Sequence, residues 1–152
     1  MALGYDFNAA RNGVKGINEN VVCVYLRPVF FFYPEELMDI ESIREYCLSL
    51  PHVTERVQWG NDLLFCIGEK MFAVAGLDPK HGVKLSFKCT PERFAELIEE
   101  DGIIPAPYVA RYHWVGLEKL DALPARVLKT QLKIAYELVR DKLPKRLRDR
   151  LQ

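Results

Sequence analysis

The spacing of hydrophobic positions predicts an ordered series of helices and strands from residue 38 onward. Asp39 is suited to a helix N-cap, and the apolar residues of the segment 40–50 recur at intervals of three and four before Pro51 ends the pattern. This segment is therefore predicted to form the first helix.

Strand patterns follow a polar connector. The segments LLFCI (63–67) and KMFAVA (70–75) flank Gly68-Glu69, which predicts a hairpin with a two-residue turn; glycine in the first turn position favours type II′. In VKLSFK (83–88) apolar and polar residues alternate strictly. One face of this third strand should contact the core, and the other should carry lysines.

The second half of the sequence predicts two further helices. Thr90-Pro91-Glu92 combines an N-cap, a proline in the first turn and an acid near the positive end of the helix dipole, so a helix should span about 91–100 and stop at Gly102. Pro124 begins a longer segment with two adjacent apolar rows. This last helix should be the main one packed on the sheet.

Between these helices we expect a loop and a strand. The segment IIPAPY (103–108) has too many prolines for a central strand and is predicted to be a loop, whereas RYHWVGL (111–117) is predicted to be a strand. The order of elements predicts an α+β fold with two layers, an antiparallel β-sheet packed against helices.

Length and charge limit the range of functions. At 152 residues the chain is long enough for one domain with its own core. Its 21 Lys and Arg residues balance 21 Asp and Glu residues, so any attraction for nucleic acid must come from a local patch. The strongly basic segment is RDKLPKRLRDR (140–150), which holds six basic and two acidic residues.

The first 37 residues do not share the pattern of the rest. They are interpreted either as an extension upstream of a natural start at Met38 or as an extra strand at 21–33. The domain proper is expected at 38–143, followed by a basic tail at 144–152. The apolar run at 21–33 is interrupted by Arg27-Pro28, and the chain does not begin with the basic segment of a signal peptide, so a cytoplasmic protein without membrane contact is expected.

No catalytic or metal-binding motif is evident. The four cysteines are widely spread, without a C-x-x-C pair, and the three histidines are scattered. No nucleophile with a base, carboxylate pair or phosphate loop can be placed by spacing, so an enzyme is the least favoured class. We expect no cofactor, no metal and no catalytic residues.

Several motifs together resemble one family. They are CLSLP (47–51), FCIGEKMFA (65–73), VKLSFKCTPE (83–92), a proline-rich loop closing on His113-Trp114, and Ala135-Tyr136. This combination resembles the MmcQ/YjbR family over about 38–143. The resemblance implies a small α+β domain from a family commonly labelled DNA-binding. The chain departs from the family pattern at 107–110, where polar residues are usual, and at Ala135, where serine is common.

The residues suggest one surface for DNA. If 111–117 is a strand, Arg111 and His113 share a face, and they could join the lysines of neighbouring strands to contact phosphates. The candidate nucleic-acid-binding residues are Lys70, Lys84, Lys88, Arg111 and His113. The simpler interpretation is that these are ordinary solvated charges.

The alternative function is a protein- or small-ligand-binding module that uses the aromatic segment 103–114. Its candidate pocket residues are Pro105, Tyr108, Tyr112 and Trp114. Binding to DNA should weaken steeply with salt, whereas an apolar contact should not.

Overall fold

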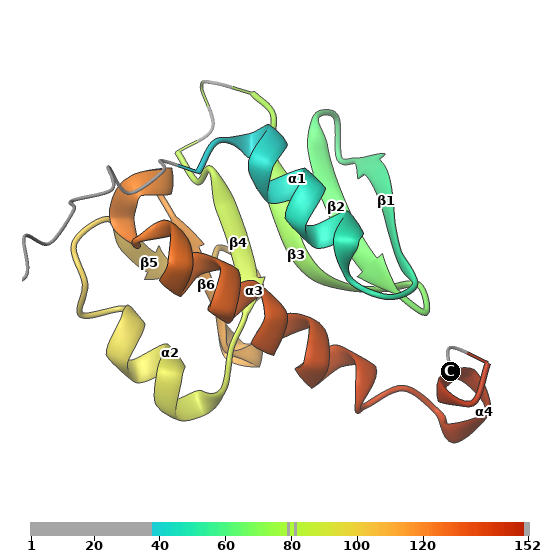
Figure 1. Cartoon of the computed structure of the whole chain (residues 1–152). Helices are drawn as coiled ribbons and strands as arrows, with labels where there is room; N and C mark the ends of the chain where they lie inside the picture. The colour runs from blue at the N-terminus through green and yellow to red at the C-terminus, as the bar shows by residue number, and fades with distance from the viewer. Residues whose placement is uncertain (1–37, 79, 81, 151–152) are drawn as a thin grey trace, which may run out of the picture. The chain divides into compact units, whose positions relative to one another are not determined.

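The computed structural model describes residues 38–78, 80 and 82–150 and contains a six-stranded antiparallel sheet in the order β1-β2-β3-β4-β6-β5. The strands are β1 (Val53–Gln58), β2 (Asp62–Ile67), β3 (Lys70–Gly76), β4 (Leu85–Lys88), β5 (Ile103–Pro105) and β6 (Trp114–Leu117). The helices are α1 (Ile40–Ser49), α2 (Pro91–Leu97), α3 (Ala125–Arg140) and α4 (Lys145–Arg148), with short 3-10 turns η2 (Ala110–Tyr112) and η3 (Leu120–Ala122). The predicted α+β class is confirmed (Figure 1).

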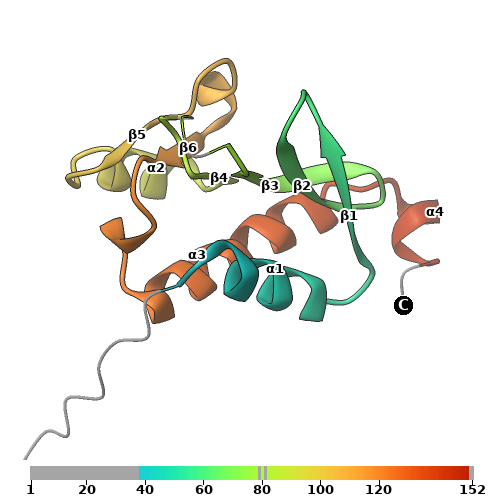
Figure 2. The same cartoon turned by 90° about the horizontal axis from the view of Figure 1, so that it is seen from above.

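Helices α1 and α3 lie together on one face of the sheet, as Figure 2 shows. The core between the layers is continuous, because Leu97 of α2 belongs to the same buried cluster as Leu128 and Leu132 of α3. Alternation along β4 gives Leu85 and Phe87 to this core. The amphipathic pattern of the sequence therefore identified the helix-facing side of β4 and the inner row of α3.

A register shift in the β2–β3 hairpin lets two consecutive residues of β3 enter the core. Pairing changes between Phe65 and Cys66, and both Phe72 and Ala73 are fully buried in the core cluster. A bulge of this kind places two residues opposite one and so breaks strict alternation. The ring of Phe72 lies edge-on to Tyr136 of α3, with the ring centroids 5.8 Å apart.

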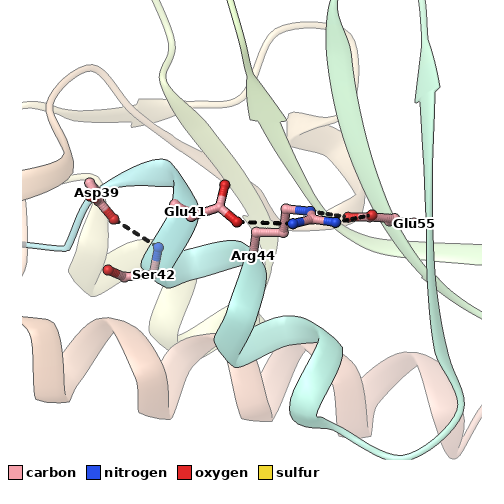
Figure 3. Close-up of polar contacts among 5 residues, drawn as sticks. All are labelled: Asp39, Glu41, Ser42, Arg44 and Glu55. Carbon is pink, nitrogen blue, oxygen red and sulfur yellow. Dashed lines mark hydrogen bonds and ion pairs between the residues drawn. The ribbon is translucent and has the colours of Figure 1, made fainter.

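Helix α1 begins where the sequence predicts and is tied to the first strand. The Asp39 carboxylate accepts a hydrogen bond from the Ser42 backbone N–H at 2.7 Å, which caps the helix. Arg44 donates two hydrogen bonds, of 2.6 and 2.7 Å, to the carboxylate of Glu55 in β1 (Figure 3). These bonds to Arg44 hold the pKa of Glu55 below its ordinary value.

Strand β1 falls in the segment that the pattern interpreted as a polar connector. It pairs antiparallel with β2, and Glu55 stands opposite Phe65 on the helix-facing side. A charged residue in the inward row removes the alternation that would have revealed the strand. Arg44 compensates for that charge, but the sequence alone does not indicate that Arg44 and Glu55 pair.

The turn between β2 and β3 has the predicted length but a different type. Gly68 and Glu69 both have positive φ, 52° and 65°, which corresponds to type I′ and not to the predicted type II′. Type I′ matches the right-handed twist of the strands, and Glu69 must adopt a left-handed conformation that a side chain disfavours. The twist of the hairpin outweighs this local cost.

Gly68 also permits a close approach by the chain beyond α3. A β-carbon at Gly68 would lie 2.9 Å from Cδ1 of Leu143, which is buried. We expect Gly68→Ala to lower the free energy of unfolding by about 1–2 kcal/mol, because it adds left-handed strain and displaces Leu143. Glu69→Gly, at the neighbouring left-handed position, should be neutral or stabilising. Urea unfolding of both variants measures the difference, and equal stability would contradict this packing.

The segment predicted as a loop at 103–108 begins with a strand. Residues Ile103–Pro105 form β5, which pairs with β6 at the edge of the sheet. An edge strand tolerates proline because one side of its backbone needs no partner. The expectation about residues 1–37 lies outside the described residues. Among the residues that are described, no helix has the length and apolar character to cross a membrane.

Candidate nucleic-acid interface

The segment predicted as a strand at 111–117 divides into two parts. Ala110–Tyr112 forms the 3-10 turn η2, His113 follows in a left-handed conformation with φ 60°, and β6 begins only at Trp114. The left-handed residue breaks the alternation, so the predicted pairing of Arg111 with His113 on one sheet face is wrong. We call residues 106–113 the aromatic loop. Figure 2 shows it projecting on the side of the sheet opposite α1 and α3.

Both ends of the aromatic loop are fixed to the sheet. The backbone N–H of Ala106 donates to the Trp114 carbonyl at 3.0 Å, and the backbone N–H of Cys89 donates to the His113 carbonyl at 2.9 Å. The ammonium of Lys88 donates to the Tyr112 carbonyl at 2.6 Å. The loop is thus held in one conformation, with Lys88 as its side-chain support.

Lys88 is half-buried, and this environment affects its charge. Burial lowers its pKa, and the nearby positive charge of Lys142 lowers it further. Leu143 packs at Gly68 in the β2–β3 turn, and β4 pairs with β3 so that Lys88 lies toward that turn, so the chain beyond α3 reaches the same end of the sheet as Lys88. Lys88 is therefore bonded to the aromatic loop at the end of the sheet that the C-terminal segment reaches.

The aromatic loop presents two tyrosines and an arginine to solvent. The side chain of Tyr108 is 96% exposed and has a left-handed backbone, with φ 66°, while Tyr112 is 53% exposed. The guanidinium of Arg111 lies over the Tyr112 ring, 4.8 Å from its centroid. An exposed aromatic at a strained backbone position is unusual and motivates a functional hypothesis.

His113 packs against α2 and is only partly available at the surface. Its ring lies edge-on to Phe94 of α2, with the centroids 5.8 Å apart, and the residue is half-buried. Glu92, in the first turn of α2, is close by: its pKa is lowered chiefly by its own backbone hydrogen bond and the Thr90 hydroxyl, and to a smaller extent by His113. An acid next to His113 makes this part of the surface poorly suited to a phosphate.

The other two lysines lie away from this loop. Lys84 immediately precedes β4, and its backbone forms hydrogen bonds with Leu117 and Gly76. Lys84 is four residues before Lys88, which places the two lysines about 13 Å apart along an extended strand. Lys70 stands opposite Ile67, a core residue, so it projects on the helix-facing side. Of the five candidates, Arg111 and His113 belong to the aromatic loop and Lys88 bonds to it, whereas Lys70 and Lys84 lie elsewhere, so no single sheet face carries all five.

The predicted tail is folded against the domain. Leu143 is buried at the β2–β3 turn, Leu147 packs against the core, and residues 145–148 form α4 (Figure 1). We call the exposed cations of this segment the basic end. They are Lys142, Lys145, Arg146, Arg148 and Arg150. The two leucines at the spacing of a helical turn were the sequence signal for this docking.

The acids of the same segment take little away from its positive charge. Asp141 is paired with Arg140 at 2.9 Å, and Arg148 donates to the Asp141 backbone carbonyl at 3.5 Å. With Asp141 paired, Asp149 is the remaining acid among the described residues from 140 to 150. The basic end thus keeps a local positive field on a chain of zero net charge.

The alternative pocket residues do not enclose one cavity. Trp114 is buried, Pro105 is exposed, and the Tyr108 ring is almost wholly in solvent. A side chain exposed to this extent cannot line a closed pocket together with a buried tryptophan. These residues form a projecting surface instead.

Neither Cys89, beside the loop, nor Cys47, in α1, is an activated thiol. Burial raises the pKa of the Cys89 thiol to about 11 and that of Cys47 to about 12, so both remain protonated thiols at neutral pH. Within the described ranges, no group of three or more His, Cys, Asp or Glu side chains is placed to hold a metal ion.

Comparisons with known proteins agree with this architecture. A solved structure of a Deinococcus radiodurans protein with a DUF419 domain is similar at 29% identity and a TM-score of 0.67, covering 76% of this chain and 88% of that one. A Pseudomonas syringae protein shares the fold at 19% identity and a TM-score of 0.55, over 66% of this chain and 98% of that one. No curated protein matches the sequence. The family model YjbR matches residues 48–138, more than half of the chain, and the protein therefore belongs to the YjbR family.

Proposed function

We propose that this protein binds DNA, without reading its sequence, through the phosphates that the basic end attracts. The observation that carries the proposal is the docking of the segment 140–150 by Leu143 and Leu147, which holds five exposed cations at one place on a neutral protein. Fixed cations lose less conformational freedom on binding than those of a free arm. The DNA-binding label implied by the sequence resemblance agrees with this distribution of charge.

The proposal needs no cofactor and assigns no catalytic residue. Lys and Arg side chains contact phosphate oxygens as charges, which positions a strand without identifying its bases. Lys88 contributes to the same field, although its half-buried ammonium is already engaged by the Tyr112 carbonyl. Its main role in the proposal is to hold the aromatic loop in place through this hydrogen bond.

A titration of labelled DNA with the full chain over a series of salt concentrations tests the proposal. Because neutralised phosphates release counterions, the logarithm of the association constant should fall linearly with the logarithm of salt, by about 0.9 per phosphate for a duplex and about 0.7 for a single strand. No binding at low salt, or an affinity that salt leaves unchanged, would overturn it.

A second candidate is a protein-binding module centred on the aromatic loop. The high exposure of Tyr108 and Tyr112 favours it, because tyrosines commonly anchor protein interfaces. Such binding would rest on buried ring area and would respond weakly to salt. The salt series therefore separates the two candidates.

A further inference from the structure

We propose that the aromatic loop takes the bases of an unpaired nucleic-acid strand, so that the preferred ligand is single-stranded. This inference rests on the proposed function, since the basic end would hold the phosphates of the same strand. Its basis is the arrangement of Tyr108, Arg111 and Tyr112 on a loop that the sheet holds rigidly.

The exposed rings are suited to stacking. A base can lie on an aromatic ring or on the plane of an arginine guanidinium, and such contacts tolerate any base. The Arg111 guanidinium already lies over the Tyr112 ring, 4.8 Å from its centroid, and a base could add to this pair because both residues are exposed. The Tyr108 ring, 96% exposed, offers a second position.

The loop holds these rings away from the core. Ala106 is buried and accepts hydrogen bonds from the backbone N–H groups of Val109 and Ala110, which closes the turn that contains Tyr108. At the other end of the loop, Lys88 fixes the Tyr112 carbonyl. A preorganised platform binds with a smaller entropic cost than a flexible one.

The charge of the loop is compatible with a polyanion. The segment 103–117 contains no aspartate or glutamate and carries Arg111. Lys88 bonds to this loop and lies at the end of the sheet where Leu143 of the C-terminal segment packs, so it adds positive charge between the rings and that segment. A strand could therefore have bases at the loop and phosphates toward the basic end.

A single strand fits this surface better than a duplex. In a duplex the base faces are stacked on one another, and projecting tyrosines reach only groove edges and backbone. The two rings would then contribute little to binding. The arrangement thus predicts a preference for unpaired strands that depends on the tyrosines.

The test compares a labelled 20-nucleotide oligo-dT with a duplex of equal length, at fixed salt, for the full chain and for Tyr108→Ala, Tyr112→Ala and the double variant. Stacking lost per base costs about 1–3 kcal/mol, so each single variant should bind oligo-dT roughly 5- to 150-fold more weakly. Duplex affinity should change little, and the salt slope should not change because no cation is removed.

Controls isolate the role of the rings. Tyr108→Phe and Tyr112→Phe keep a ring and should retain most of the affinity for oligo-dT. Trp59→Ala removes a different exposed aromatic, 66% exposed, and should have no effect. An oligo-U of the same length distinguishes DNA from RNA: tighter binding of either strand, lost in the tyrosine variants, supports stacking and identifies the sugar that the surface accepts.

Two failures would be distinguishable. Salt-sensitive binding with a duplex preference, or with oligo-dT affinity unchanged in the double variant, overturns the stacking inference and leaves the proposed function intact. Absence of salt-sensitive binding to both probes overturns the proposed function, and the stacking inference with it.

Discussion

Phe72→Ala should lower the free energy of unfolding by about 3–5 kcal/mol, which is a large share of the total stability of a domain. The ring is fully buried, and it contacts Tyr136 of α3 edge-on at 5.8 Å and Phe65 at 6.4 Å between centroids. Its removal would leave a cavity where the bulged hairpin meets the main helix. Equilibrium denaturation in urea measures the loss.

Two control variants should lose much less stability than Phe72→Ala. Val57→Ala, at a residue 57% exposed on β1, should change stability by less than about 1 kcal/mol. Tyr136→Phe keeps the ring but loses the hydrogen bond to the Pro51 carbonyl, 3.1 Å long, and should cost about 0.5–1.5 kcal/mol. A Phe72→Ala loss as small as that of Val57→Ala would contradict the described core.

Periodicity and capping predicted the elements whose signals are local. Asp39 caps α1 and Thr90 caps α2, as expected from residues within one turn of each helix. Alternation correctly assigned Leu85 and Phe87 to the core. These signals hold because a helix face or strand face is set by neighbours only a few residues away.

The errors arose where a distant residue decides the local structure. Glu55 faces the helices because Arg44, on another element, pairs with it, so β1 had no hydrophobic pattern. The strand predicted from Arg111 onward was wrong because His113 adopts a left-handed conformation, which ends the assumed alternation. That backbone is held by bonds from Cys89 and Lys88, 24 residues before their partners. Neither constraint is visible in residues 108–117 alone.

The second large effect concerns the basic end. Replacing four of its cations by glutamine should lower DNA affinity roughly a few hundredfold to a few thousandfold at 0.1 M salt, if each contacts one phosphate, because the salt slope would fall by about 3. The four are Lys142, Lys145, Arg146 and Arg148. All four are exposed, so stability should change little.

A matched control removes the same amount of charge elsewhere. Its four exposed cations, all outside the segment 140–150, are Lys80, Lys119, Arg126 and Lys133. Because both variants have the same net charge, any difference in their DNA affinity reflects where the cations lie and not the total charge of the protein. Thermal unfolding of both variants confirms that the fold is kept.

The salt slope of binding in the two charge-matched variants tests most directly whether this YjbR protein binds nucleic acid at the basic end, as we propose. We predict that the slope of log association constant against log salt becomes shallower by about 3 in the basic-end variant. The slope of the control variant should stay close to that of the unmodified protein. Equal slopes in the two variants, or a larger loss in the control, would contradict it.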